Sequence, residues 1–153
     1  MKNINNNLNI QATLDLLDSY LKKKNILREF VVGGGAAVEL LGAKNWLNEH
    51  TTQFNDRYPI GWELRVVEVF QGKALRVLSV GKRDLVFSKI IAELDRGFDK
   101  DDIIALAPTE SELDWLEKEI PKAKSNTGHL FEKWEIDQLF AEIRERLDYD
   151  NDD

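Results

Sequence analysis

The stretch FVVGGGAAVELLG (residues 30–42) decides how the chain folds. It opens as an aromatic and β-branched run, passes through Gly33, Gly34 and Gly35, and continues into residues of high helix propensity. Glycines let the backbone approach a ligand closely, and the amides at the start of a helix favour an anion. The sequence therefore predicts a strand, a glycine turn and a helix, in which the turn either binds an anion or packs the helix against a sheet.

Outward from this unit, helical and strand patterns alternate along the chain. A helix is expected over residues 10–24, because leucines recur at helical spacing and three lysines occupy the last turn. A β-hairpin is expected from residues 62–70 and 74–80 around a Gln-Gly turn. Further helices are expected over residues 85–94, 99–107, 109–120 and 136–147. The predicted fold class is α+β, with a small sheet, flanking helices and a helical C-terminal part.

Composition limits the classes of function. The chain has 153 residues, enough for one domain with a real core, and no cysteine, which excludes disulfides and thiolate metal sites. No apolar run approaches the about 18 residues that span a bilayer, so we expect a cytoplasmic protein without a membrane partner. The net charge is −7, and residues 108–153 hold six basic and fourteen acidic side chains. This acidic end is either a solvated terminus or a docking tail for a basic partner.

Two common phosphate-binding motifs do not match the glycine turn. A Walker A loop needs a Gly-Lys-Ser/Thr step, which is absent, and a dinucleotide fingerprint needs a third glycine where Val38 stands. A third arrangement remains, in which the turn holds the phosphates of a nucleotide and carboxylates on the next strand hold a metal ion.

Three segments in order resemble one protein family. Residues 30–42, the Trp-Leu-Asn segment at 43–48, and residues 84–92 with the later Arg96, Asp99 and Asp102 are similar to nucleotidyltransferase-fold proteins. Within that fold they look most like an uncharacterised bacterial family related to AbiE-type toxin–antitoxin nucleotidyltransferases. The resemblance covers residues 8–120 and implies a small mixed sheet of the nucleotidyltransferase type. We expect a nucleotidyltransferase-like core over residues 1–107, with the acidic helical extension 108–153 packed on it.

The resemblance also implies an activity and its partners. These would be Mg²⁺-dependent transfer of a nucleotide to RNA or protein, a nucleoside triphosphate or RNA as ligand, and a cognate antitoxin or toxin as partner. Gly33, Gly34 and Gly35 would hold phosphate, with Lys89 and Arg96 lining the site.

The chain departs from the family at the acid-bearing strand. The family pattern has an Asp-x-Asp pair shortly after the glycine helix, whereas residues 41–49 contain no such pair. Either that strand is deleted, or a stretch is missing at the Gly42–Ala43 junction, or one helix runs over residues 36–49. Glu68 is then the candidate catalytic acid, because apolar neighbours at 64, 66 and 70 place it on the face toward the glycine turn. Without the acid pair, the alternative is a non-catalytic interaction module with a degenerate fold.

Charged residues after the hairpin offer further candidates. Lys82, Lys89 and Arg96 are seven residues apart and share a helix face, either as a phosphate or RNA contact stripe or as a solvated face with ion pairs such as Arg96 with Asp99. Asp99 and Asp102 either contribute to a metal site or cap the helix that starts there.

Overall fold

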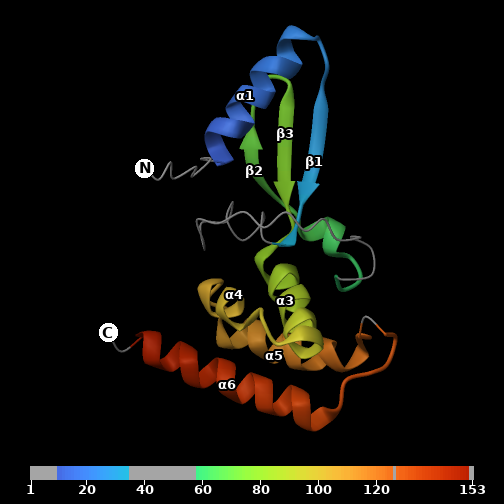
Figure 1. The fold of residues 1–153 in the computed structure, drawn as a ribbon, viewed down its shortest axis with the longest axis vertical. Helices are drawn as coiled ribbons and strands as arrows, with labels where there is room; N and C mark the ends of the chain where they lie inside the picture. The colour runs from blue at the N-terminus through green and yellow to red at the C-terminus, as the bar shows by residue number, and fades with distance from the viewer. Residues whose placement is uncertain (1–9, 35–57, 126, 152–153) are drawn as a thin grey trace, which may run out of the picture.

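The computed structural model describes residues 10–34, 58–125 and 127–151, with side chains up to residue 148 (Figure 1). In chain order the elements are helix α1 (Ile10–Lys23), strand β1 (Arg28–Val32), 3-10 helix η1 (Trp62–Arg65), strands β2 (Val67–Gln71) and β3 (Leu75–Ser79), helices α3 (Lys82–Arg96), α4 (Lys100–Ala105) and α5 (Glu110–Glu119), 3-10 helix η2 (Ile120–Lys122) and helix α6 (Lys133–Asn151). Gly35, the Gly42–Ala43 junction and the helix expected over 36–49 lie outside the described residues.

The described strands form one mixed sheet in the order β1-β3-β2. Strand β1 pairs parallel with β3, from Arg28 opposite Leu75 to Val32 opposite Ser79, and β2 pairs antiparallel with β3 as the predicted hairpin. Leucines of α1, among them Leu21, pack on the sheet side that carries Phe70, Leu75 and Val77. The predicted α+β class, with a small mixed sheet, is confirmed.

The first strand of the hairpin is shorter than predicted. Residues 62–65 form a 3-10 turn, entered through Gly61 at φ 81°, and the strand begins only at Val67. Trp62 is buried with Tyr58 and Val80, so aromatic packing overrides the β pattern read from residues 62–66. The expectation of a continuous strand over 62–70 is therefore wrong.

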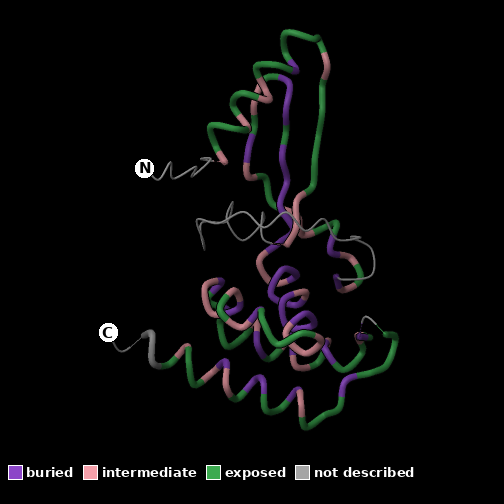
Figure 2. The backbone as a smooth tube through the Cα atoms, viewed as in Figure 1, coloured by how far each residue is buried: buried purple, intermediate pink, exposed green. Residues whose placement is uncertain are grey.

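Helices α3, α4, α5 and α6 make up the lower part of Figure 1, where β3 runs directly into α3. Their positions confirm the predicted helices: α3 ends at Gly97 in a left-handed conformation, and α5 begins with a capping box between Thr109 and Glu112. Figure 2 shows buried positions on the inward sides of α3 and α6 and exposed positions along β1. The largest core cluster runs from Leu85 to Ile143 and so joins residues on both sides of position 107. The division into a core over 1–107 and an extension over 108–153 stays a prediction.

Helix α6 is tied to α5 by charge as well as by its apolar side. The Arg144 guanidinium lies 2.7 Å from a carboxylate oxygen of Glu110 and 2.7 Å from one of Glu117. Helical structure continues through Asn151, so most of the acidic end is helical. None of the helices in the described ranges is both long enough and apolar enough to cross a membrane.

Asp18 of α1 fixes the hairpin turn to the helix. Its carboxylate accepts the backbone N–H groups of Lys73, Ala74 and Leu75 at 3.1, 2.7 and 2.8 Å. A Cβ at Gly72 would lie 2.2 Å from this carboxylate, so only glycine leaves room for the contact. The hydrogen bond from Ala74, with those from Lys73 and Leu75, outweighs desolvation and lowers the pKa of Asp18 below its ordinary value.

Because the pKa of Asp18 is lower in the folded state, its contribution to stability is present above the unfolded value and is lost as pH falls through the folded value. We expect Asp18→Asn to lower the melting temperature at pH 7. We also expect the variant to lose less further stability than the wild type as pH falls below about 4, the unfolded pKa of aspartate. Thermal melts at pH 7 and pH 3 measure both effects. Equal acid sensitivity in the two proteins would contradict this role.

Candidate functional site

Several residues singled out in the sequence line one small hollow beside α3. We call it the Gly34 hollow; it has a volume of about 50 Å³. Its described lining consists of Gly34, Tyr58, Ser88, Lys89, Ala92, Arg96 and Asp99. The predicted glycine turn and the two predicted cations therefore meet, although the chain separates Gly34 from Lys89 by more than fifty positions.

Gly34 supplies an open backbone wall. Its φ is +60°, a left-handed conformation that favours glycine, and a Cβ there would meet no atom within 4 Å. Gly33 connects β1 to this residue, and both are partly exposed. The bend at the end of β1 is thus open to solvent, as an anion-binding turn requires, while Gly35 lies outside the described residues.

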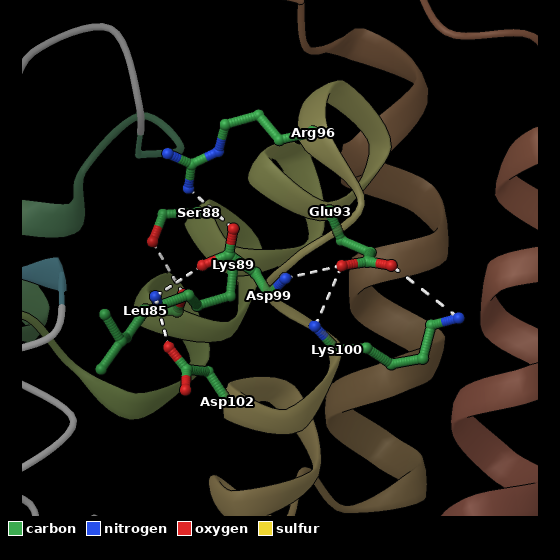
Figure 3. A network of polar contacts seen from close by, with 8 residues as sticks. All are labelled: Leu85, Ser88, Lys89, Glu93, Arg96, Asp99, Lys100 and Asp102. Carbon is green, nitrogen blue, oxygen red and sulfur yellow. Dashed lines mark hydrogen bonds and ion pairs between the residues drawn. The ribbon is translucent and has the colours of Figure 1, made fainter. Parts of the chain in front are cut away.

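Lys89 is buried between two carboxylates (Figure 3). Its Nζ lies 2.7 Å from Oδ1 of Asp99 and 2.6 Å from Oδ2 of Asp102. Burial opposes the ammonium charge, but the hydrogen bonds with Asp102 and Asp99 outweigh it and raise the pKa of Lys89 above its ordinary value. Lys89 therefore remains charged and joins α3 to α4.

Arg96 is the more accessible cation of the hollow. Its side chain is 49% exposed, and Nη2 donates to Oδ2 of Asp99 at 2.7 Å. The Asp99 carboxylate thus bridges Lys89 and Arg96, one through each oxygen. The predicted ion pair of Arg96 with Asp99 is confirmed. Because Lys89 would still balance Asp99, Arg96 can turn toward a ligand without leaving a carboxylate unpaired.

Asp99 does not cap α4 with its side chain, contrary to the capping alternative for this residue. It stands at the N-cap position without a side-chain capping bond. Instead, the carboxylate of Glu93 caps the start of α4, because it accepts the N–H groups of Asp99 and Lys100 at 2.7 and 3.0 Å. The capping role of Glu93 was not among the predictions made from the sequence. One indication was present, because an acid in the last turns of a helix opposes the dipole and so suggests a partner elsewhere.

Glu68 lies away from the hollow, so the apolar placement expected for it is wrong. It pairs with Arg76, whose Nε donates at 2.8 Å, and Arg76 also pairs with Glu29. The register shifts between Glu68 and Phe70, which breaks the alternation that would place both on one face. Phe70 is therefore buried under α1, whereas the Glu68 side chain remains 45% exposed.

The other cations at the start of α3 are engaged with later helices. Lys82 donates to the carbonyl of Ala107 at 2.8 Å and lies 3.2 Å from a carboxylate oxygen of Glu112. The Arg83 guanidinium lies 4.1 Å from the ring centre of Trp115. Of the predicted stripe, only Lys89 and Arg96 line the hollow.

Asp99 and Asp102 do not fit a magnesium site. The ammonium group of Lys89 lies between their carboxylates and occupies the place that a metal ion would need. Within the described ranges, no three acidic or histidine side chains group to hold a metal ion. A magnesium site therefore stays a prediction for the remaining part of the chain.

Comparison with family models, with curated proteins and with solved structures found no match for this chain.

Proposed function

We propose that this chain is a nucleotidyltransferase-like protein of a bacterial toxin–antitoxin or defence system that binds nucleotide phosphate at the Gly34 hollow. The observation that carries the proposal is the meeting of Gly34, Lys89 and Arg96 around one opening. The ligand is a nucleoside triphosphate or the phosphate of an RNA end.

The chemistry of the hollow suits phosphate oxygens rather than a whole nucleotide. A volume of about 50 Å³ is far below the about 300–1,000 Å³ of pockets that enclose a small organic molecule, so the base and sugar stay outside. Arg96 offers a planar, charged fork that matches a phosphate group, and Gly34 lets the ligand reach the backbone. Lys89 adds positive charge behind Asp99, but its ammonium group is held by the carboxylates of Asp99 and Asp102.

Binding without transfer is the second candidate, and a specific observation favours it. Glu68, Asp99 and Asp102 each pair with a cation of the chain itself. Nucleotidyl transfer needs carboxylates that hold Mg²⁺ against the triphosphate. Mg²⁺-dependent transfer to RNA or protein would thus require acidic residues outside the ranges that the structure describes. The alternative is an interaction module that uses nucleotide as a ligand.

Equilibrium dialysis with each labelled nucleoside triphosphate, with and without Mg²⁺, tests the proposal. The wild type is expected to bind, and Arg96→Gln is expected to weaken binding by about tenfold or more, because hydrogen bonds to charged groups contribute about 1.5–3 kcal/mol. Arg146→Gln is the matched control: Arg146 is 45% exposed and pairs with Asp101, and it does not line the hollow.

Two results separate the candidates. Transfer of label to RNA or to the protein, dependent on Mg²⁺, would support the enzyme over the module. Absence of triphosphate binding in the wild type, or an equal loss in Arg146→Gln and Arg96→Gln, would contradict phosphate binding at the hollow.

A further inference from the structure

A second, larger cavity lies between α3 and the segment that follows α5. We call it the Ile60 cavity; its volume is about 670 Å³. Its described lining includes Tyr58, Ile60, Phe87, Ile91, Lys122 and Lys124. Cavities of about 300–1,000 Å³ bind small organic molecules, whereas the Gly34 hollow is far smaller. This cavity therefore has the size of a ligand site in its own right.

One side of the cavity is apolar and already ordered. Phe87 and Ile91 project from α3 and belong to the main core cluster, and Tyr58 is buried against Trp62. Ile60 stands at this side with its side chain 100% exposed. An apolar ligand body placed here would cover Ile60 and contact Phe87 and Ile91, so its burial would favour binding.

The other side of the cavity carries a surplus of positive charge. Lys122 lies 2.7 Å from a carboxylate oxygen of Glu119, so these two balance each other. Lys124 makes no ion pair within the described part of the chain. One lysine is therefore left to meet a ligand, in a protein whose net charge is −7.

The loop that carries Lys124 is a built turn. Lys124 forms an antiparallel bridge with Leu130, and the buried Ser125 hydroxyl accepts the N–H groups of Thr127 and His129 at 3.3 and 3.2 Å. Ser125 Oγ also lies 2.8 Å from Nδ1 of His129. These bonds commit the hydroxyl to holding the turn rather than to attack on a substrate, and they fix the backbone of Lys124 beside the cavity.

We propose that the Ile60 cavity binds a small organic anion with an apolar body. The body packs against Ile60, Phe87 and Ile91, and the acidic head meets the ammonium group of Lys124. This site is separate from the Gly34 hollow and does not depend on nucleotide binding there. A neutral ligand of the same shape would gain the apolar contacts but not the charge contact.

Fluorescence titration with two probes of one shape tests the proposal. The probes are 1-anilinonaphthalene-8-sulfonate and its neutral counterpart, N-phenyl-1-naphthylamine. We expect the sulfonate to bind more tightly than the neutral probe. We expect Lys124→Gln to weaken sulfonate binding by up to about fivefold, the upper limit for an exposed ion pair. Lys118→Gln is the control, because Lys118 is an exposed lysine of α5 that does not line the cavity.

Position 60 gives a second test that does not threaten the fold, because the Ile60 side chain is fully exposed. Ile60→Glu is expected to weaken sulfonate binding, and Ile60→Lys is expected to bind it more tightly than Ile60→Glu. The proposal would be overturned if both variants bound the sulfonate equally. It would also be overturned if Lys118→Gln weakened binding as much as Lys124→Gln, or if the neutral probe bound as well as the sulfonate.

Discussion

Replacing Lys89 with methionine is expected to lower the free energy of unfolding by about 3–5 kcal/mol, the range for removing one partner of a buried ion pair. Lys89 neutralises Asp99, which is buried, and Asp102, which is partly buried. Methionine keeps the apolar stem of the side chain but removes the ammonium group between the two carboxylates, so that only the half-exposed Arg96 remains to pair with Asp99. Urea denaturation at pH 7 measures the change.

Two controls separate the buried charge from a general loss of packing. Arg96→Gln, at the half-exposed end of the same network, is expected to cost less than about 1 kcal/mol. A triple variant with Lys89→Met, Asp99→Asn and Asp102→Asn is expected to recover part of the lost stability, because no buried carboxylate remains unpaired. A cost for Lys89→Met no larger than that for Arg96→Gln would contradict a buried ionic link between α3 and α4.

The same network predicts an alkaline limit to stability. The pKa of Lys89 is raised by Asp102 and Asp99 against the opposing effect of burial, so its contribution is present below the unfolded value, about 10.4, and is lost as pH rises through the higher folded value. The wild type should therefore lose more stability than Lys89→Met above about pH 10.4.

Replacing Arg65 with methionine is the second change of large expected effect, again about 3–5 kcal/mol. Arg65 Nε and Nη2 donate to the two carboxylate oxygens of Asp84 at 2.8 and 2.7 Å, and the Asp84 side chain is 0% exposed. Without Arg65, this carboxylate at the start of α3 loses the guanidinium that neutralises it. Chemical denaturation at pH 7 measures the cost.

The control for Arg65 is Arg28→Met. Arg28 is exposed, and its Nη1 donates to the carbonyl of its neighbour Leu27, so its loss should change stability by less than about 0.5 kcal/mol. Similar small costs for both variants would show that Asp84 finds other partners. The backbone of Gly81, just before α3, also lies close to that of Arg65, because a Cβ at Gly81 would lie 2.5 Å from the carbonyl oxygen of Arg65.

The helices and the hairpin were predictable because their determinants are local. The capping box at Thr109, the leucine spacing of α1 and the glycine after α3 each act within a few residues. The start of β2 was not predictable in the same way. Burial of Trp62 with Tyr58 and Val80, a tertiary contact, decided where the strand begins. The register shift between Glu68 and Phe70 decided which face Glu68 occupies.

The candidate site residues were predicted from the glycine turn, from the seven-residue spacing of Lys89 and Arg96, and from the family resemblance. The structure places Gly34, Lys89 and Arg96 around one hollow, but the local pattern gave no means to foresee that Lys89 is buried. That burial depends on how α4 packs against α3 and presents Asp99 and Asp102 to it. The capping role of Glu93 likewise depends on the turn between these helices.

The most direct measurement of phosphate binding is a nuclear magnetic resonance titration of the ¹⁵N-labelled full chain with adenosine triphosphate. Phosphate at the Gly34 hollow is expected to shift the backbone amide of Gly34 and the Nε–H of Arg96 most strongly, with the Arg146 Nε–H unchanged. If both Gly34 and Arg96 stayed unshifted up to millimolar triphosphate while resonances elsewhere moved, the hollow would not be the phosphate site.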